Sequence, residues 1–316
     1  MRFFPSIAGA TGVRLAAPPL RALLHGLVDY AGIFPPARLG LGEAVENYSR
    51  YQRSGQNWTL GRFIVPLARL AEFERALDTV RDESAAREPW KLSVLLGNDM
   101  KADAETIRSF NHRRAGAAQG PEVRIESAER KVATPEEIAN AAEQIPPGIE
   151  TYFEVPLTDD LPTLVAEIRK VKGRAKVRTG GETAPLFPSC GQIAFFLGVC
   201  RAAEIPFKAT AGLHHPLRSY QRFTYAADSP SGMMHGFLNV FAAGAFVLHG
   251  MNAKDAESVL SEESAEAFRF EAGGISWRDK KLTSEAIQSA RQSFCTSFGS
   301  CSFTEPVADL QTLHLL

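Results

Sequence analysis

The chain contains two stretches, RAKVRTGG (residues 174–181) and IPFKATAGLHHP (residues 205–216), that each place one lysine among small and apolar residues. In both stretches polar and apolar residues alternate, which is typical of a β-strand. The spacing between Lys176 and Lys208 leaves room for one strand, one helix and the next strand. We therefore expect two consecutive βα units of a barrel, with both lysines directed into one site.

The same alternation of short apolar strands and helical patterns continues along the chain. The expected strands are residues 26–37, 61–67, 90–97, 122–127, 150–157, 175–181, 206–212 and 267–277. The expected helices are residues 41–53, 70–83, 102–114, a helix that follows Thr134, 161–171, 192–203, 236–248 and 284–298. Eight βα units in order predict an α/β fold of the (β/α)8 TIM-barrel class. A doubly wound open sheet has less support, because no GxGxxG follows an early strand.

The length of 316 residues suits a single barrel domain. We expect an N-terminal extension over residues 1–25 and the barrel itself over residues 26–298. Residues 299–316 are rich in small side chains at their start, and we expect them to form a C-terminal tail that packs on the barrel.

Composition argues against several classes of function. A net charge of −1, from 35 basic and 36 acidic residues, disfavours a nucleic-acid surface or a polybasic membrane patch. The four cysteines have neither a CxxC pair nor zinc-ligand spacing, as expected of reduced thiols in the cytoplasm. No signal peptide is recognised, and the longest apolar run, residues 236–251, is too short to span a bilayer. We expect a cytoplasmic protein with a small-molecule substrate, and a homo-oligomer is compatible with the sequence.

Charged side chains fall on the inward face of four neighbouring strands. Successive strand side chains point to opposite faces, so the apolar positions can be assigned to the side that meets the helices. The residues left inside the barrel are Arg124, Glu126, Tyr152, Glu154, Lys176, Arg178, Lys208 and Thr210. Barrel interiors usually contain Val, Ile and Leu, and an unpaired buried charge costs several kcal/mol. The pattern predicts a charged active site at the carboxyl ends of the strands, or a buried network in which Glu126 and Glu154 neutralise the cations.

Two lysines at matching depth suit two kinds of chemistry. An amine is nucleophilic only when neutral, and burial or a second cation lowers its pKa from about 10.4. Lys176 could be a Schiff-base nucleophile with Lys208 as its cationic neighbour and Arg178 one pleat further along. The same three side chains could instead bind a carboxylate or a phosphate with no covalent step.

The motifs KVRTG, which begins at Lys176, and KATAG, which begins at Lys208, resemble strands 6 and 7 of deoxyribose-phosphate aldolase. That family consists of class I aldolases with a (β/α)8 barrel. The resemblance implies that Lys176 is the Schiff-base nucleophile, that Lys208 lowers its pKa, and that Glu154 is the family's strand-5 glutamate. It covers about 60 residues of the chain. The acid/base aspartate of strand 4 would be replaced by Glu126, and the family's phosphate-binding glycines have no counterpart beyond Gly273-Gly274.

A wider combination of motifs supports the same fold. The chain contains DYAG and FPPA within residues 29–37, then K-RTGG, and then FKATAGLHHP. This combination is similar to a set of bacterial barrel proteins with no assigned function. It implies a barrel and leaves the chemistry open.

Three histidines are candidates for the mouth of the barrel. His214 and His215 follow the seventh expected strand, and a neutral imidazole there could be a general base or a metal ligand. Adjacent side chains of an extended chain point apart, so we expect one of the two to face the site. His235, at the start of an expected helix, could meet an anion. For each histidine, a role in capping or in hydrogen bonding to the backbone is the alternative.

Asp29 and the pair Gly180-Gly181 are further candidates for the same mouth. Asp29 ends the first expected strand and could reach the site, or it could serve the turn before the double proline. Gly180 and Gly181 follow the sixth strand, and they could bring backbone amides close to an anion or form a tight turn.

The expected catalytic residues are Lys176, Lys208, Glu154 and Glu126. The expected substrate-binding residues are Arg178, Arg124, Thr210, His214, His215, Asp29, Gly180, Gly181 and His235. The preferred function is a class I lyase of aldolase type that acts on a small polar or anionic carbonyl compound and uses no cofactor and no metal. Two alternatives stay open. One is a metal-assisted lyase or isomerase that uses Glu126, Glu154 and His214, and the other is a non-catalytic barrel that binds an anionic ligand.

Overall fold

The structure of the protein is a computed structural model, and it describes residues 16–80, 89–115 and 121–316. The first fifteen residues of the expected N-terminal extension lie outside the described residues, as does the end of the helix predicted over residues 70–83. Within the rest of the extension, α1 (Pro18–Leu24) is a short helix with a proline in its first turn. In the part of the chain that the structure describes, none of the helices has the length and apolar character of a membrane span.

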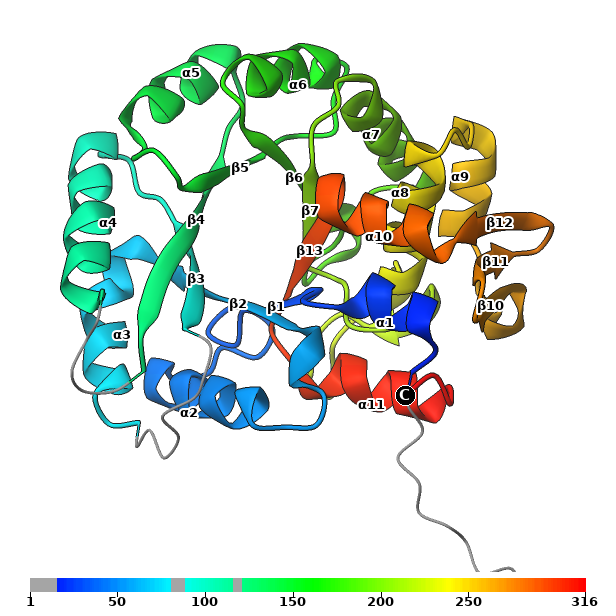
Figure 1. Ribbon diagram of the computed structural model, residues 1–316, viewed down its shortest axis with the longest axis horizontal. Helices are drawn as coiled ribbons and strands as arrows, with labels where there is room; N and C mark the ends of the chain where they lie inside the picture. The colour runs from blue at the N-terminus through cyan, green and yellow to red at the C-terminus, as the bar shows by residue number, and fades with distance from the viewer. Residues whose placement is uncertain (1–15, 81–88, 116–120) are drawn as a thin grey trace, which may run out of the picture.

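Eight parallel strands close into a barrel, so the predicted TIM-barrel class is confirmed (Figure 1). The strands are β1 (Val28–Tyr30), β2 (Leu60–Pro66), β3 (Trp90–Leu95), β4 (Val123–Lys131), β5 (Glu150–Glu154), β6 (Arg174–Arg178), β7 (Phe207–Thr210) and β13 (Cys295–Ser300). They follow one another around the barrel in chain order, and β13 closes it by pairing with both β7 and β1.

Helices surround the barrel on its outer side (Figure 1). They are α2 (Leu41–Gln52), α3 (Leu70–Leu77), α4 (Met100–Arg114), α5 (Pro135–Gln144), α6 (Leu161–Lys170), α7 (Cys190–Ala202), α8 (Phe237–Leu248), α9 (Ala253–Leu260), α10 (Ser284–Ser293) and α11 (Thr304–Thr312). Single 3-10 turns cover Asn57–Thr59, Leu67–Arg69, Ala184–Leu186 and Ala265–Ala267. Local sequence fixes several helix starts. Thr134 and Ser189, for example, form capping boxes with Glu137 and Gln192.

The prediction for the eighth strand, residues 267–277, is wrong. That segment belongs to a three-stranded antiparallel sheet of β10 (Phe268–Glu271), β11 (Gly274–Trp277) and β12 (Lys280–Thr283), which lies beside the barrel (Figure 1). The closing strand β13 instead falls at the end of the helix predicted over residues 284–298, because α10 stops at Ser293. α11 follows β13 and lies within residues 299–316.

Another pair of strands projects from the barrel after β7. The strands β8 (Ser219–Arg222) and β9 (Ser231–Met234) form an antiparallel hairpin, and Phe223 at its turn stacks on Phe187 with the ring centroids 4.7 Å apart. Phe187 follows the 3-10 turn after β6, so the hairpin contacts the loops at the carboxyl ends of the strands.

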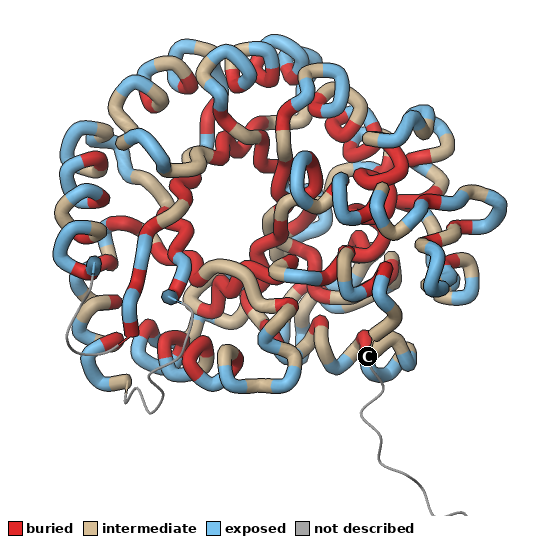
Figure 2. The backbone as a smooth tube through the Cα atoms, viewed as in Figure 1, coloured by how far each residue is buried: buried red, intermediate tan, exposed pale blue. Residues whose placement is uncertain are grey.

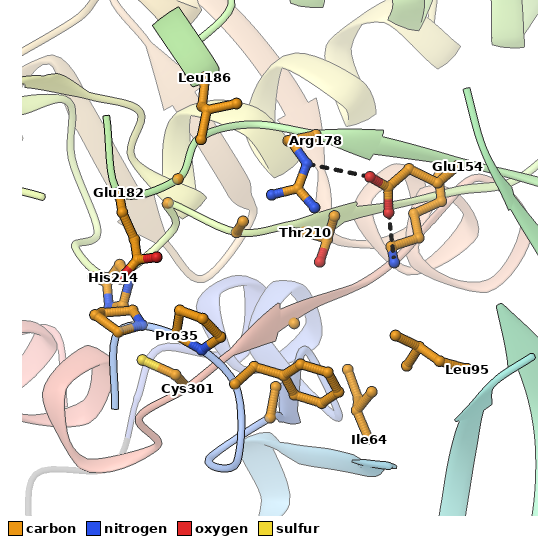
Figure 3. Close-up of a pocket in the computed structure, with 18 of the residues that line it drawn as sticks. Pro35, Ile64, Leu95, Glu154, Arg178, Glu182, Leu186, Thr210, His214 and Cys301 are labelled. Atoms are coloured by element: carbon orange, nitrogen blue, oxygen red, sulfur yellow. Dashed lines mark hydrogen bonds and ion pairs between the residues drawn. The ribbon is translucent and has the colours of Figure 1, made fainter. Parts of the chain in front are cut away.

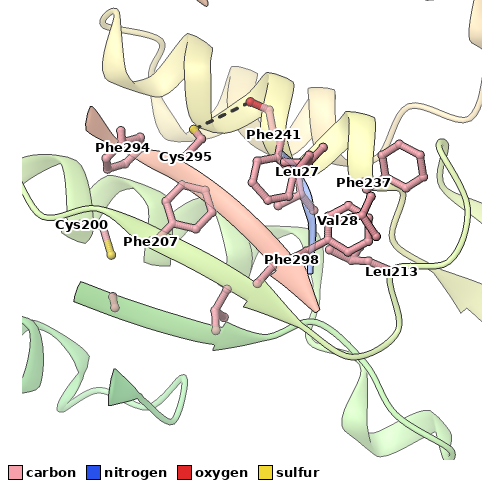
Figure 4. Close-up of a cluster of buried hydrophobic side chains, with 14 of the residues drawn as sticks. Leu27, Val28, Cys200, Phe207, Leu213, Phe237, Phe241, Phe294, Cys295 and Phe298 are labelled. Carbon is pink, nitrogen blue, oxygen red and sulfur yellow. Dashed lines mark hydrogen bonds between the residues drawn. The ribbon is translucent and has the colours of Figure 1, made fainter. Parts of the chain in front are cut away.

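The core lies between the outer face of the barrel and the inner faces of the helices. Figure 2 shows buried positions on the strands and on the inward sides of the helices, with exposed positions on the outside. Around β7 and β13 the core is aromatic, and Phe207 lies 6.0 Å from Phe241 of α8 and 5.1 Å from Phe294 between ring centroids (Figure 4). Phe207 and Ala209 therefore point outward, as predicted, and Lys208 between them points into the barrel.

Gly244 lets α8 lie close to this aromatic cluster. A Cβ atom built at Gly244 would lie 2.6 Å from the Cys295 sulfur and 3.1 Å from the Phe207 ring. Both neighbours are fully buried, so neither has room to move away. A helix glycine usually costs stability, and here the close approach explains its presence.

We predict that Gly244→Ala destabilises the protein by about 1–3 kcal/mol through overpacking. Gly198→Ala is the matched control, because Gly198 also lies within a helix but a Cβ there meets nothing within 4 Å. The control should be more stable than the wild type by about 0.5–1 kcal/mol. Urea-unfolding free energies measure both changes, and equal effects of the two substitutions would contradict this account of α8.

Candidate functional site

A cavity of about 260 Å³ opens where the strands of the barrel end. The residues that line it come from seven of the barrel strands, from Ala31 directly after β1, and from the loops at the carboxyl ends of the strands, which is where sites lie in TIM barrels. One part of the wall is charged and is formed by Glu129, Glu154, Lys176 and Arg178. The facing part is largely apolar and includes Ile64 and Leu95 (Figure 3).

The charged wall belongs to a chain of ion pairs that crosses the barrel interior. Glu129 binds both lysines, with Oε2 2.7 Å from Nζ of Lys176 and Oε1 2.6 Å from Nζ of Lys208. Lys176 also lies 2.9 Å from Oε2 of Glu154, and Lys208 lies 2.7 Å from Oδ2 of Asp29. Each lysine therefore contacts two carboxylates, and Glu129 joins the two lysines.

Strand register places these groups at one level of the barrel. Lys176 of β6 pairs with Lys208 of β7 and with Glu154 of β5. Two hydroxyls complete the shell of the carboxylates, since Ser93 of β3 donates to Glu129 at 2.6 Å and Ser297 of β13 donates to Asp29 at 2.7 Å. The pairing of the main chains therefore determines which charged groups lie next to one another, and the flexible side chains need only small adjustments to make the ion pairs.

The two lysines differ in their access to the cavity. Lys208 has no exposed surface, and its ammonium lies 5.2 Å from the centre of the Tyr152 ring. Lys176 is 5% exposed and is part of the cavity wall. A bound molecule can therefore reach Lys176 directly, whereas Lys208 lies behind Glu129.

The network is electrically balanced, since three carboxylates (Asp29, Glu129 and Glu154) face three cations (Lys176, Lys208 and Arg178). Burial alone would raise the pKa of Glu129, but the ammonium groups of Lys176 and Lys208 outweigh burial and hold this pKa far below its usual range. Burial alone would lower the pKa of Lys208, but Asp29 and Glu129 outweigh it and raise this pKa above its usual range.

Glu154 shows the same balance at the edge of the cavity. Burial alone would raise its pKa, but Lys176 and Arg178 together hold it below the usual range. Arg178 contacts Glu154 through Nε at 3.2 Å, and its side chain is 44% exposed. Nη1 donates a long hydrogen bond, 3.4 Å, to the Gly180 carbonyl, and the remaining N–H groups of the guanidinium are available to a ligand in the cavity.

Glu129 was missed by the sequence analysis because β4 contains a β-bulge. Leu92 of β3 pairs with Ile125, but the next residue, Ser93, pairs with Ser127, so Glu126 is an extra residue in β4. After the bulge, odd-numbered side chains such as Glu129 face inward in place of even-numbered ones. The strand also continues to Lys131, beyond the predicted end at residue 127.

Arg124 and Glu126 do not join the charged wall, contrary to the sequence-based expectation. Glu126 lines a second cavity, of about 630 Å³, at the amino ends of the strands, where it lies 3.7 Å from Arg62. Arg124 lies two residues earlier in β4 and is exposed. The bulge and the length of β4 explain the difference, because they carry the strand from the amino end at Glu126 to the mouth at Glu129.

The metal-assisted alternative required Glu126, Glu154 and His214 to meet. Glu154 and His214 both line the cavity at the mouth, but Glu126 lies at the opposite end of the barrel. Within residues 16–80, 89–115 and 121–316, no group of three or more His, Cys, Asp or Glu side chains is arranged to hold a metal ion.

Of the three candidate histidines, His214 lines the cavity that contains Lys176, whereas His215 and His235 are not among the residues of its wall. His214 is buried, lines the cavity, and contacts Glu305 Oε2 through Nδ1 at 2.9 Å. His215 contacts Asp309 through Nδ1 at 2.6 Å and lines a neighbouring cavity beside the β8–β9 hairpin. His235 contacts the Pro188 carbonyl through Nε2 at 2.7 Å, and burial lowers its pKa.

The remaining candidates are close to the cavity but have different roles. Thr210 and Gly181 line it directly. Asp29 lies below it, inside the network with Lys208. Gly180 permits close packing of the loops after β6 and β7, because a Cβ there would lie 2.4 Å from the Phe187 ring and 2.8 Å from the Cα of Gly212.

Comparison with known proteins gives no family for this chain. No protein-family model matches it, and no curated protein is significantly similar to it. A fold alone does not define a function, so function has to be inferred from the residues of the site.

We predict that Glu129→Gln lowers the free energy of unfolding by about 3–5 kcal/mol, because it leaves two buried ammonium groups short of a carboxylate. Glu126→Gln is the matched control. It removes a carboxylate of the same strand that is partly exposed, and the loss should be at most about 1 kcal/mol. Urea unfolding at pH 7 compares the two, and a similar small loss in both variants would contradict the bridging role of Glu129.

We predict that unfolding stability is highest on a plateau and falls at both ends of the pH scale. The pKa values of Glu129 and Glu154 are lower in the folded protein than in the unfolded chain, so their contribution is lost as pH falls below about 4.3. The pKa of Lys208 is higher in the folded protein, so its contribution is lost as pH rises above about 10.4. Unfolding free energies from pH 3 to 11 should show both limbs, and Glu154→Gln should have a shallower acid limb. An acid limb that Glu154→Gln leaves unchanged would contradict the assignment.

Proposed function

We propose that the protein is a Schiff-base lyase of the aldolase type, in which the Lys176 amine attacks a small polar or anionic carbonyl compound. One observation carries the proposal. Of the two joined lysines, Lys176 lies on the cavity wall, while Lys208 is sealed behind Glu129 as a permanent cation. A ligand in the cavity can therefore react with the amine of Lys176, whereas Lys208 remains a buried cation that is paired with carboxylates.

Lys176 must lose a proton before it can attack a carbonyl carbon. Glu154, 2.9 Å away and also on the cavity wall, is placed to accept that proton. The Nζ–C bond then forms as the carbonyl double bond opens, and a proton that Nζ gives up moves to the carbonyl oxygen, which becomes a hydroxyl. Glu154 returns the proton it holds to this hydroxyl, which leaves as water, and the carbinolamine becomes an iminium ion.

The network also suits the iminium through its charge. Both species carry one positive charge at Nζ, so Glu129 and Glu154 attract either one, although the iminium has a single N–H and donates to only one of the two carboxylates. Such a fixed environment contributes to catalysis because it needs no reorganisation during the reaction. The positive iminium then acts as an electron sink for breaking or making the adjacent C–C bond.

The resemblance to deoxyribose-phosphate aldolase supports this proposal with one change of residue. The resemblance calls for an acid/base carboxylate on the fourth strand, and Glu129 occupies such a place between the two lysines. Lys208 departs from the expected role, because two carboxylates surround it and raise its pKa. We assign it to holding Glu129 ionised and in position.

The substrate is expected to be small and to carry a negative charge near its carbonyl group. A volume of about 260 Å³ is below the usual range of pockets for drug-sized ligands, about 300–1,000 Å³. The half-exposed guanidinium of Arg178 borders the same wall as Lys176 and suits a carboxylate. As the sequence suggests, we place the reaction in the cytoplasm with no nucleic-acid partner.

The second candidate function is a non-catalytic barrel that binds an anionic ligand. The pairing of each lysine with two carboxylates favours it, because a fully paired cation is not a free nucleophile. In that case Arg178 would hold the ligand and Lys176 would remain an ammonium throughout.

We predict that sodium borohydride traps a covalent adduct of one probe molecule per chain when the protein is incubated with pyruvate, glyoxylate or glycolaldehyde. Intact mass would detect the adduct, and peptide mapping would place it on Lys176. Lys176→Arg keeps the charge but has no amine that can form an imine, so this variant should give no adduct. Lys170→Arg, on the surface of α6, is the control and should trap as well as the wild type. An adduct that persists in Lys176→Arg would refute the lyase proposal, and binding without any adduct would favour the second function.

A further inference from the structure

The cavity has a second polar end, away from the lysines. In Figure 3, Glu154 lies on one side of the cavity, whereas His214 and Glu182 lie on the other. His214 follows β7, and Glu182 follows β6. Neither residue belongs to the ion network around Glu129, so the carbonyl chemistry proposed above leaves this end of the cavity without a role.

Of the two ring nitrogens of His214, Nδ1 is hydrogen-bonded within the described part of the chain and Nε2 is not. Nδ1 lies 2.9 Å from Glu305 Oε2, and the same oxygen accepts a hydrogen bond from the Tyr225 hydroxyl at 2.9 Å. Burial alone would raise the pKa of Glu305, but His214 and Tyr225 outweigh burial and keep the pKa low, so Glu305 is a carboxylate. When the imidazole is neutral, an ionised partner favours the tautomer with its proton on Nδ1, and in that tautomer Nε2 carries a lone pair.

Nε2 of His214 has no hydrogen-bond partner among the described residues, and the side chain borders the cavity. Glu182, a carboxylate at the same end, binds Arg38 through both oxygens, at 2.9 and 2.8 Å, and still has lone pairs left to accept further bonds. This end of the cavity therefore presents hydrogen-bond acceptors, and it favours a donor over an anion.

The stretch between the two ends is apolar along one side only. Ile64 and Leu95 lie on the side opposite Arg178, Pro35 lies toward His214 (Figure 3), and Phe34 also lines the cavity. The other side of this stretch carries Thr210 and Arg178. The cavity therefore has an anion-binding end, a middle with one apolar side, and an acceptor end.

We propose that the substrate is a 2-oxo acid whose far end carries a hydroxyl group, and that His214 accepts a hydrogen bond from that hydroxyl. This inference rests on the proposed function, because it assigns the 2-oxo group to Lys176 and the adjacent carboxylate to Arg178. Glu305 is a positioning residue, since it acts by fixing the proton of His214. Tyr225 supports Glu305 in the same way.

His215 gives a matched control for His214. The two histidines are adjacent, and each is bonded through Nδ1 to a carboxylate of α11, Glu305 for His214 and Asp309 for His215. Both line the cavity beside the β8–β9 hairpin, but among the described residues only His214 of the pair also lines the lysine cavity. Asparagine keeps the donor that reaches the carboxylate and removes the second nitrogen, so His214→Asn and His215→Asn are equivalent changes.

The experiment compares 2-oxo acids that differ only in the far hydroxyl, using the concentration that gives half-maximal borohydride-trapped adduct at pH 8. The pairs are 4-hydroxy-2-oxobutanoate with 2-oxobutanoate, and 4-hydroxyphenylpyruvate with phenylpyruvate. A third acid, 2-oxoglutarate, carries a carboxylate at the far end. We expect the hydroxyl compound of at least one pair to trap at a concentration about three- to tenfold lower than its parent, as expected for one hydrogen bond. We also expect 2-oxoglutarate to be the weakest.

His214→Asn should abolish the preference for the hydroxyl compound, and His215→Asn should retain it. Glu305→Gln, which no longer fixes the imidazole proton, should reduce the preference without removing adduct formation. The inference is overturned if the parent acids or 2-oxoglutarate trap as well as the hydroxyl compounds, or if both histidine variants behave alike. If none of the five acids gives an adduct, the Schiff-base function fails, and calorimetric binding of the same acids to the wild type and to His214→Asn still decides the role of His214.

Discussion

The bridge from Glu129 to two lysines is the interaction on which the interior of this barrel depends. A single carboxylate binds Lys176 with one oxygen and Lys208 with the other, at 2.7 and 2.6 Å. Without it, two ammonium groups on neighbouring strands would face each other in a medium of low dielectric constant. The adjoining Asp29 and Glu154, together with Arg178 at the edge of the cavity, bring the total charge to zero, so five charged groups can occupy a place that apolar side chains usually fill.

The buried ion network contributes little to the stability of the fold, but it positions the groups of the site. Replacing a buried ion network with well-packed apolar side chains is often neutral or stabilising, so the network is weak as a source of stability. Its effect is to fix the position of each group through strand register. It also keeps Glu129 and Glu154 ionised and Lys208 protonated. Local loss of stability at a rigid, pre-arranged site is a general feature of functional centres.

The parts of the site that lie on regular strands could be predicted from the sequence, and the parts that depend on tertiary structure could not. Alternation along β6 and β7 correctly directs Lys176 and Lys208 inward, because neither strand contains an irregularity between its ends. In β4 a single extra residue shifts the inward face from Glu126 to Glu129, and no local pattern marks a bulge. The strand CTSFGS at residues 295–300 has weak strand preference, and it becomes a strand because β1 and β7 leave a place for it.

The late position of β13 in the chain bears on how the protein is made. Before residues 295–300 leave the ribosome, β1 and β7 each have one edge without its barrel neighbour, although their partners on the other side are already synthesised. Open strand edges are sites of intermolecular pairing, and contacts between the two ends of a long chain form slowly. Vectorial synthesis therefore leaves a nearly complete barrel open for the time needed to translate residues 211–294, from the β8–β9 hairpin to α10, so this is the stage at which a nascent chain most needs a chaperone.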